Sequence, residues 1–468
     1  MLQFFIYLVY NMYAPKNGGS MNKIWFVIII WISKILYIFS KVFNKNICIG
    51  KFACKMQKNF IRYFSNIDYN NVIVITGTNG KSLTSTITLN ILNQSGKTVI
   101  SNIDENNNIS GIASAFIKKC GFFGRIKCDF ILLDVNENII EEFYDLIAFK
   151  NLCVTNIQSD YIRSNGNILY RFNNIRNIID DGMTLYINND DPNSKLLGEE
   201  LDKTIYFGVS KNERSYIQKD LFDVSVSCPK CGNKIIFNYN NTNNMGNFRC
   251  SNCDYKSESN PTHQIVRIDY DNNEIVCNKD KYSVSNIEPI YLYSYACSIS
   301  ICRNFGITKK QIEEGFNILE NNILNVKVRD KNIKYIQIKH ESAESFKFAM
   351  DYISEDKNNK VVVIGIDTHK YINTFVMYDS NLSNILNTNI EKCICFTKDV
   401  CYDIANILSY AGLPKDKILV LNTDSYISVF REINKLNVDN IYLVSCNHKY
   451  DELKRYASSI EKDDNNEK

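Results

Sequence analysis

A glycine-bounded loop carries the clearest chemical pattern in the chain. The run Thr76-Gly-Thr-Asn-Gly-Lys-Ser82 follows a β-type stretch and opens a helical one. Gly77 and Gly80 allow backbone N–H groups to approach phosphate oxygens, and the N-terminus of the helix adds a positive dipole end. Lys81 supplies a point charge for phosphate, and Ser82 supplies a hydroxyl for Mg²⁺. The loop therefore predicts nucleotide binding by six residues: Gly77, Thr78, Asn79, Gly80, Lys81 and Ser82.

This loop is shorter than the general phosphate-binding pattern. That pattern has a glycine five residues before Gly80, where this chain has Ile75. An ordinary glycine-rich turn with a solvated lysine is the alternative interpretation. The strand before the loop and the helix after it favour nucleotide binding.

Two pairs of cysteines form a second pattern. Cys228 and Cys231 make one C-x-x-C pair, and Cys250 and Cys253 make another. Each pair can present two thiolates to one tetrahedral ion, so the four predict a structural zinc site on a β-hairpin ribbon. Because four thiolates leave no position for water, the metal is expected to stabilise the insert rather than to catalyse. A redox dithiol and unrelated buried cysteines are the alternatives.

Composition and charge limit the class of protein. The chain has 468 residues, 45% of them hydrophobic and 22% charged, as in an ordinary globular protein. The 54 basic and 51 acidic residues leave a net charge of +3, so we expect no nucleic-acid partner. The 16 cysteines form no regular disulfide framework, which favours a reducing cytoplasm.

Residues 1–60 are predicted to form an apolar, membrane-proximal segment. The uncharged run from Ile24 to Ser33 is about half as long as a bilayer span, and Lys34 interrupts it. Extended to Phe39, the segment could cross a membrane, or it could lie in the interface with its lysines towards the headgroups. Attachment to the membrane surface is the favoured hypothesis, and a spanning helix and a buried packing helix are the alternatives.

Short β-rich runs alternate with amphipathic stretches from residue 71 onwards, which is typical of a parallel α/β sheet. The predicted strands are 72–75, 98–101, 130–133, 152–155, 184–187, 204–207, 361–364, 392–396, 418–421 and 441–444. We therefore predict an α/β protein. Its central domain, with a parallel sheet, covers residues 61–315 and contains a zinc-ribbon insertion at 222–275; a smaller C-terminal α/β domain covers 320–460.

The order of these features resembles the Mur ligase superfamily. The apolar segment, the T-G-T-N-G-K-S loop, the turn Asn188-Asn-Asp-Asp-Pro192, the four-cysteine ribbon and the second α/β domain follow one another as they do in that superfamily. The inserted ribbon is typical of MurT, the group of synthetase subunits of lipid II isoglutaminyl synthase. The resemblance covers roughly residues 22–450 and is stronger before residue 260 than after residue 325.

The resemblance implies a Mur ligase-like central domain that binds ATP, and an ATP-dependent carbon–nitrogen ligase of peptidoglycan synthesis. In this family ATP converts the α-carboxylate of D-glutamate in the lipid II stem peptide to an acyl phosphate. Ammonia then displaces phosphate, which gives D-isoglutamine. A GatD-like glutaminase subunit delivers the ammonia within a heterodimer. ATP, Mg²⁺ and structural Zn²⁺ are the implied cofactors, and the cytoplasmic side of the cell membrane is the implied location.

The resemblance also implies acidic residues near the nucleotide. The run Leu133-Asp-Val-Asn-Glu137 stands where the family has a Glu-Val-Asp-Glu strand end, whose acidic side chain holds Mg²⁺. Asp134 is one methylene shorter than Glu, so either Asp134 or Glu137 would be the working ligand. A carboxylate at a helix N-terminus is the alternative for each. Asn156 and Asp160 match an Asn-x-x-x-Asp pattern after the next strand.

The C-terminal half departs from the family pattern. The Asn of a Tyr-Asn-x-Tyr-Asn helix is absent at 291–294, a Gly-Arg-x-Glu turn is reduced at 326–329, and a Lys-Asn-Pro segment is altered at 339–345. A Tyr-Asp pair ending at Asp379 stands for the family's Trp-Asp, so Asp379 is the candidate catalytic acid of this domain, with Asp367 as second choice. A loop-capping role is the alternative.

The chain lacks the G-x-C-x-G nucleophile turn with a partner histidine that a glutaminase needs, so any ammonia that it uses is expected to come from a partner subunit. The leading hypothesis is therefore the synthetase subunit of a glutamine-hydrolysing amidotransferase. One alternative is a stand-alone Mur-type ligase that joins an amino acid to a carboxylate. The other is a nucleotide-binding scaffold with weakened catalysis that keeps the partner interface.

Overall fold

The computed structural model describes residues 23–42, 48–158, 167–217, 226–242, 244–287, 289–316, 323–329, 331–338, 343–366 and 388–466.

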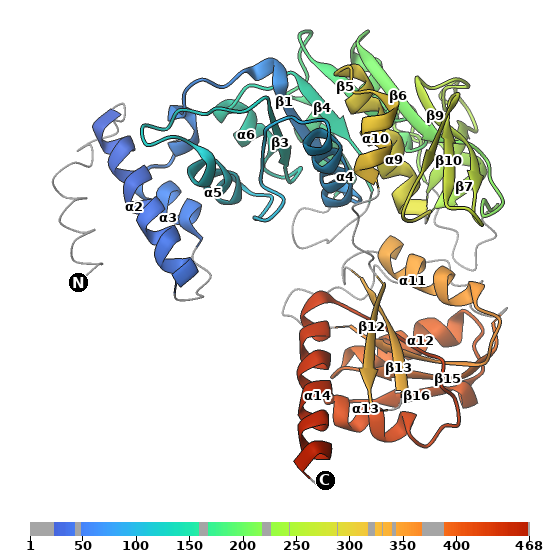
Figure 1. Ribbon diagram of the computed structural model, residues 1–468. Coiled ribbons are helices and arrows are strands. Elements are labelled where there is room, and N and C mark those ends of the chain that lie inside the picture. Colours follow the sequence, from blue (N-terminus) through green and yellow to red (C-terminus); the bar gives the residue numbers. More distant parts are fainter. Residues whose placement is uncertain are drawn as a thin grey trace.

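Two α/β units follow one another along the chain (Figure 1). The helices of the first unit are α2 (Lys23–Val42), α3 (Ile49–Met56), α4 (Lys81–Gln94), α5 (Ile109–Lys119), α6 (Ile140–Leu146), α7 (Ile168–Arg176), α8 (Pro192–Leu197), α9 (Pro289–Asn304) and α10 (Lys309–Phe316). Its strands are β1 (Val72–Thr76), β2 (Val99–Ser101), β3 (Phe130–Asp134), β4 (Asn151–Val154), β5 (Thr184–Asn188), β6 (Thr204–Val209), β7 (Ile235–Thr242), β8 (Met245–Cys250), β9 (His263–Asp269), β10 (Glu274–Cys277) and β11 (Asp280–Ser283).

A nine-stranded sheet forms the centre of this unit, in the order β11-β10-β9-β6-β5-β4-β1-β3-β2. The strands from β2 to β9 in this order are parallel, and β10 and β11 add an antiparallel edge. The prediction of a parallel α/β sheet is confirmed, and the edge makes the sheet mixed. The order reverses around β1, which lies between β3 and β4. Ligands bind at the carboxyl ends of strands beside such a reversal.

The alternating side chains of β1 reach two separate cores, which explains its unbroken apolar sequence. Val72 and Val74 pack into a cluster with side chains of α2, α3 and α5. Ile73 and Ile75 pack into a second cluster with side chains of α4, α9 and α10. Helices therefore cover both faces of the sheet.

The apolar segment predicted near the N-terminus forms α2. By length and composition α2 could cross a membrane, although 33% of its most apolar window is buried inside the protein. Trp25, Phe26, Ile29 and Ile30 are all buried in the core of the first unit. One face of α2 is thus a packing face for a folded domain.

The cysteine-rich segment contains a separate two-stranded antiparallel ribbon, β7–β8. The following strand, β9, lies in the range expected for the ribbon but joins the main sheet, where it pairs in parallel with β6.

The second unit contains a six-stranded sheet in the order β12-β13-β17-β14-β15-β16. Only the β12–β13 pair is antiparallel. Its strands are β12 (Ile323–Val328), β13 (Lys331–Gln337), β14 (Lys360–Gly365), β15 (Ile390–Phe396), β16 (Ile418–Leu421) and β17 (Ile441–Ser445), and its helices are α11 (Ala343–Glu355), α12 (Val400–Tyr410), α13 (Tyr426–Ile433) and α14 (Asn447–Asn466). Glu355, at the end of α11, accepts an ion pair at 3.2 Å from Arg214 of the first unit. The predicted smaller α/β domain is present.

Candidate functional site

The predicted phosphate loop connects β1 to α4, and its two glycines adopt backbone conformations that other residues avoid. Gly77 has a φ of +123°, and a Cβ atom there would lie 2.4 Å from Thr155 Oγ1 and 2.7 Å from the carbonyl oxygen of Asn156. Gly80 has a φ of +81° and caps α4. The loop therefore needs glycine at both positions, and it directs the N-terminus of α4 to the carboxyl edge of the sheet.

Residues that follow β4 hold the loop in shape. The Asn156 side chain accepts a hydrogen bond from the backbone N–H of Asn79 at 3.0 Å and donates one to the carbonyl oxygen of Asn79 at 2.9 Å. Thr155 Oγ1 donates to the same carbonyl at 2.7 Å, and Gln158 accepts from Asn79 Nδ2 at 3.4 Å. Asn156 thus lies at the loop, whereas Asp160 lies outside the described residues.

Three buried charges meet behind the loop. Lys81 Nζ lies 3.1 Å from Glu137 Oε2, and Arg171 Nη1 lies 3.4 Å from Glu137 Oε1. All three side chains are at most 7% exposed. Lys81 also donates to the carbonyl oxygens of Gly77 and Thr78. Buried cations need an anionic partner, so Glu137 is the counter-charge that keeps Lys81 and Arg171 at the phosphate loop.

Asp134 ends β3 next to the loop. Ser82 Oγ donates a hydrogen bond of 2.6 Å to Asp134 Oδ2. Asn102 fixes the backbone of Asp134 by accepting from its N–H and donating to its carbonyl oxygen, at 2.9 and 2.8 Å. A hydroxyl and a carboxylate at one point are the hard oxygen ligands that Mg²⁺ prefers, so the chemistry of this pair fits the ion.

The Asn188–Pro192 turn is a buried connector. Asp191 Oδ2 accepts from the backbone N–H groups of Ser194, at 2.9 Å, and Ile157, at 2.8 Å, so it caps α8 and ties β5 to the segment after β4. Asp190 accepts from the Tyr293 hydroxyl and from the backbone of Val209. Burial raises the pKa of the Asp190 carboxyl to about 6, although these donors lower it. Burial likewise raises the pKa of Asp191 to about 6.

Replacing Asp190 with asparagine is expected to stabilise the protein at neutral pH. The bonds from Val209, at 2.9 Å, and Tyr293, at 2.8 Å, both end on Oδ2, where an amide oxygen can accept both, and only the long 3.4 Å bond from Asn189 Nδ2 to Oδ1 is lost. Because the folded pKa lies above the unfolded value of 3.8, the folded state binds more protons between about pH 4 and 6, and stability falls as pH rises through that window. The Asp190→Asn variant has no carboxyl to ionise at this position. We therefore expect its free energy of unfolding to exceed that of the parent by about 1–3 kcal/mol at pH 7 and to equal it at pH 4.

Urea denaturation of both proteins at the two pH values measures this difference. A variant that is less stable than the parent at pH 7 would contradict the burial argument.

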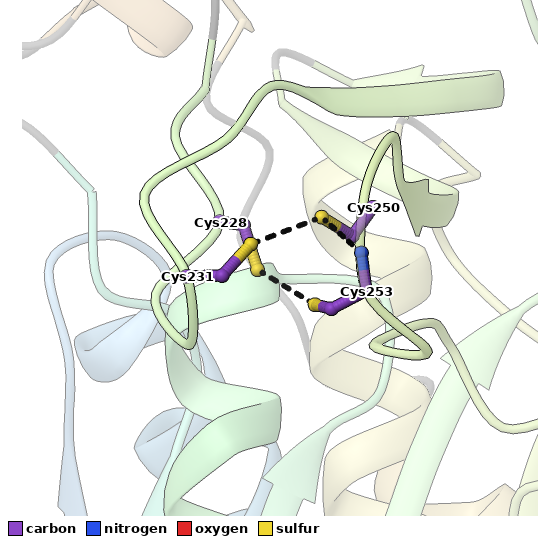
Figure 2. A group of neighbouring side chains, drawn as sticks. All are labelled: Cys228, Cys231, Cys250 and Cys253. Atoms are coloured by element: carbon purple, nitrogen blue, oxygen red, sulfur yellow. Dashed lines mark hydrogen bonds between the residues drawn. The ribbon is translucent and has the colours of Figure 1, made fainter.

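The four cysteines converge on one point at the base of the ribbon, as Figure 2 shows. Their Sγ atoms all lie within 4.8 Å of one another. Cys228 Sγ lies 3.7 Å from Cys253 Sγ, and Cys231 Sγ lies 3.5 Å from Cys250 Sγ. A tetrahedron of thiolates at about 2.3 Å from zinc has edges of about 3.8 Å, so the four fit this ion. Backbone N–H groups of Asn252 and Cys253 donate to Cys250 Sγ and support thiolate charge.

The ribbon packs directly on the turn beside the phosphate loop. The Tyr255 hydroxyl donates to the carbonyl oxygen of Pro192. Lys230 pairs with Glu199 at 2.7 Å, and Lys195 pairs with Glu199 at 2.6 Å. The cysteine-rich ribbon thus supports the region that contains Asp191.

The structure brings most of the predicted residues together, but the acidic candidates of the C-terminal domain cannot be placed in it. Gly77 to Ser82, Asp134 and Glu137 meet at the carboxyl edge of the sheet. Asp379 and Asp367 lie outside the described residues. Sequence analysis missed Arg171, which reaches Thr78 Oγ1 at 3.3 Å from α7, and Gln158. No local pattern marks either residue as part of a site.

Comparisons with known proteins agree with this geometry. The family model described as Mur ligase middle domain matches residues 75–253. The MurT subunit of lipid II isoglutaminyl synthase (glutamine-hydrolyzing) from Staphylococcus aureus COL is 26% identical over 273 residues, which are 57% of this chain and 60% of that protein. The match therefore spans less than two thirds of that relative. The MurT subunit from Streptococcus pneumoniae R6 is 23% identical over 406 residues, 85% of this chain and 88% of that protein.

Solved structures share the fold at low identity. A pseudomurein peptide ligase type C from Methanothermus fervidus superposes with a TM-score of 0.65 and 16% identity, covering 86% of this chain and 81% of its own. The MurF ligase from Thermotoga maritima in complex with ADP gives a TM-score of 0.53 and 14% identity, and the match covers 88% of this chain and 84% of that ligase. These likenesses establish the α/β fold of both units.

Proposed function

We propose that this chain, a MurT-like member of the Mur ligase family, amidates a carboxylate at the expense of ATP. The family consists of ATP-dependent ligases. The observation that supports nucleotide chemistry here is the meeting of Lys81, Ser82 and Asp134 at the reversal of the strand order. We propose that the substrate is the D-glutamate α-carboxylate of the lipid II stem peptide, and that the product is D-isoglutamine.

The proposed roles follow from the contacts of each side chain. A carboxylate is a poor electrophile, and phosphorylation by ATP gives it a leaving group that ammonia can displace. The loop from Gly77 to Lys81 would bind the phosphates, and Ser82 with Asp134 would hold Mg²⁺, which neutralises phosphate charge. Glu137 would position Lys81 and Arg171 through the contacts described above. We propose Asp379 as the catalytic acid of the C-terminal domain.

We propose that the ammonia comes from a separate GatD-like glutaminase subunit in a heterodimer. The MurT relatives are subunits of a glutamine-hydrolysing enzyme, which supports this assignment. We also propose that the four cysteines bind a structural zinc ion and that the reaction takes place in the cytoplasm at the inner face of the cell membrane.

A reconstituted reaction tests the function. The chain is mixed with a glutaminase subunit, glutamine, ATP, Mg²⁺ and lipid II, and phosphate release is measured together with the mass of the stem peptide. Amidated lipid II that forms only when both subunits are present is the expected result. Phosphate release with a free amino acid and without glutaminase would instead indicate a stand-alone ligase. Nucleotide binding without phosphate release under any of these conditions would indicate a scaffold.

A further inference from the structure

One exposed surface combines the outer face of α2 with the turn at residues 121–125. It contains six large apolar side chains: Trp31, Ile35, Ile38, Val42, Phe122 and Phe123. We call this set the α2–Phe122 surface. Phe122 is 70% exposed and Phe123 is 73% exposed, and Phe39 of α2, at 49%, is the next most exposed phenylalanine among the described residues. The four members on α2 recur every three or four residues, so they share one side of the helix.

The turn presents its two phenylalanines in a fixed position. The backbone N–H of Gly121 donates to the carbonyl oxygen of Arg125 at 2.9 Å, and that of Gly124 donates to Gly121 at 3.0 Å. Gly124 has a φ of +76°, and a Cβ atom there would lie 2.3 Å from the Phe26 ring, so the turn is packed tightly on α2. The exposure of the two rings is therefore built into the fold.

Two hydrogen bonds join the turn to the helix. Trp31 Nε1 donates to the carbonyl oxygen of Phe122 at 2.9 Å. Lys34 Nζ donates to the carbonyl oxygen of Cys120 at 2.9 Å. Segments about 90 residues apart in the chain thus form one continuous surface, which Figure 1 places at the far end of the first unit from the C-terminal sheet.

The two segments that form this surface carry only basic charged side chains, and Glu105 and Asp129 lie just outside the second segment. Neither 23–42 nor 109–128 contains an aspartate or glutamate, although the whole chain carries only +3. Lys118 is paired with Glu105, and six further cations lie in the two segments: Lys23, Lys34, Lys41, Lys119, Arg125 and Lys127. A rigid apolar surface with a basic rim is complementary to an anionic lipid surface, where rings enter the acyl boundary and cations meet the headgroups.

We propose that the α2–Phe122 surface docks on anionic membrane lipid with α2 parallel to the membrane. The opposite face of α2 contacts the protein core through Trp25, Phe26 and Ile29, so lipid cannot surround the helix while the domain is folded. This inference deepens the proposed function, on which its biological meaning rests, because a lipid-linked substrate lies at such a surface.

Sedimentation of the full chain with phosphatidylglycerol-containing vesicles, without nucleotide, tests the docking. The parent is expected to bind these vesicles, to bind phosphatidylcholine vesicles at least about tenfold more weakly, and to dissociate at high salt. The Phe122→Asp/Phe123→Asp variant is expected to bind the phosphatidylglycerol vesicles at least about tenfold more weakly than the parent, because two rings no longer enter the lipid. The control Tyr402→Asp/Ile427→Asp changes two exposed apolar side chains of α12 and α13 in the same way and should bind as the parent does.

Three results would overturn the proposal. The first is parent protein that does not bind anionic vesicles, and the second is equal binding by the parent and the Phe122/Phe123 variant. The third is a parent dimer that the variant abolishes, which would show that a second copy of the chain covers this surface. Amidation measured in detergent separates this proposal from the proposed function, because the variant should keep full activity where no bilayer is present.

Discussion

Replacing Lys81 with methionine is expected to lower the rate of ATP-dependent phosphate release by about 10²–10³-fold. The ammonium group is the cation nearest the loop carbonyls and lies 3.1 Å from Glu137, so it is the group best placed to neutralise phosphate charge. Methionine keeps the length and the apolar stem of the side chain but carries no charge. Binding of a non-hydrolysable ATP analogue, measured by calorimetry, should weaken in parallel.

The fold is expected to tolerate this change. Without Lys81, Glu137 keeps Arg171 at 3.4 Å, so one buried carboxylate still faces one buried guanidinium. Thermal unfolding checks this expectation. Lys150→Met is the matched control, because Lys150 pairs with Asp180 at 3.5 Å away from the loop. A Lys81→Met protein that binds the analogue and releases phosphate like the Lys150→Met control would disprove the assigned role of the loop.

Removal of the metal from the cysteine cluster is expected to have the second large effect. The apolar core of the ribbon consists of five buried residues, Cys228, Ile235, Phe248, Cys250 and Tyr255. Because so small a core cannot fold an insert by itself, we expect the proposed metal ion to supply most of the stability of the ribbon. The Cys250→Ser variant should therefore lose its zinc, measured as bound metal per chain, and the ribbon should become sensitive to protease.

Loss of the ribbon should also weaken nucleotide binding, by about tenfold, although no cysteine touches the phosphate loop. Tyr255 bonds to Pro192, next to Asp191, and Asp191 holds the backbone of Ile157 just before Gln158. Disorder in the ribbon removes support from this chain of contacts. Cys128→Ser, which changes a half-buried thiol outside the cluster, is the control and should keep both zinc and nucleotide affinity. A Cys250→Ser protein with full zinc content would refute the metal assignment.

Several parts of the fold could be predicted because short-range rules decide them. The β1 sequence is apolar at every position except its last, and all five side chains are buried on two sides, so its strand was visible in the sequence. The loop after it needs glycine at 77 and 80 for reasons of local backbone conformation and close approach. The N-terminal segment was predicted to be apolar and helical in length, but its pattern did not distinguish a packing face from an exposed one.

The sequence by itself determined the glycine-bounded loop, the paired spacing of the cysteines and the alternation of strands and helices, because each depends on neighbours a few residues away. Only the tertiary structure decided which distant groups meet them. Arg171 reaches Glu137 and Thr78 because the sheet places β1 between β3 and β4, and Asp190 became a buried connector because Tyr293 packs over it. Strand order and helix orientation follow from the burial of whole faces, which is a property of the assembled core and not of any local run of residues.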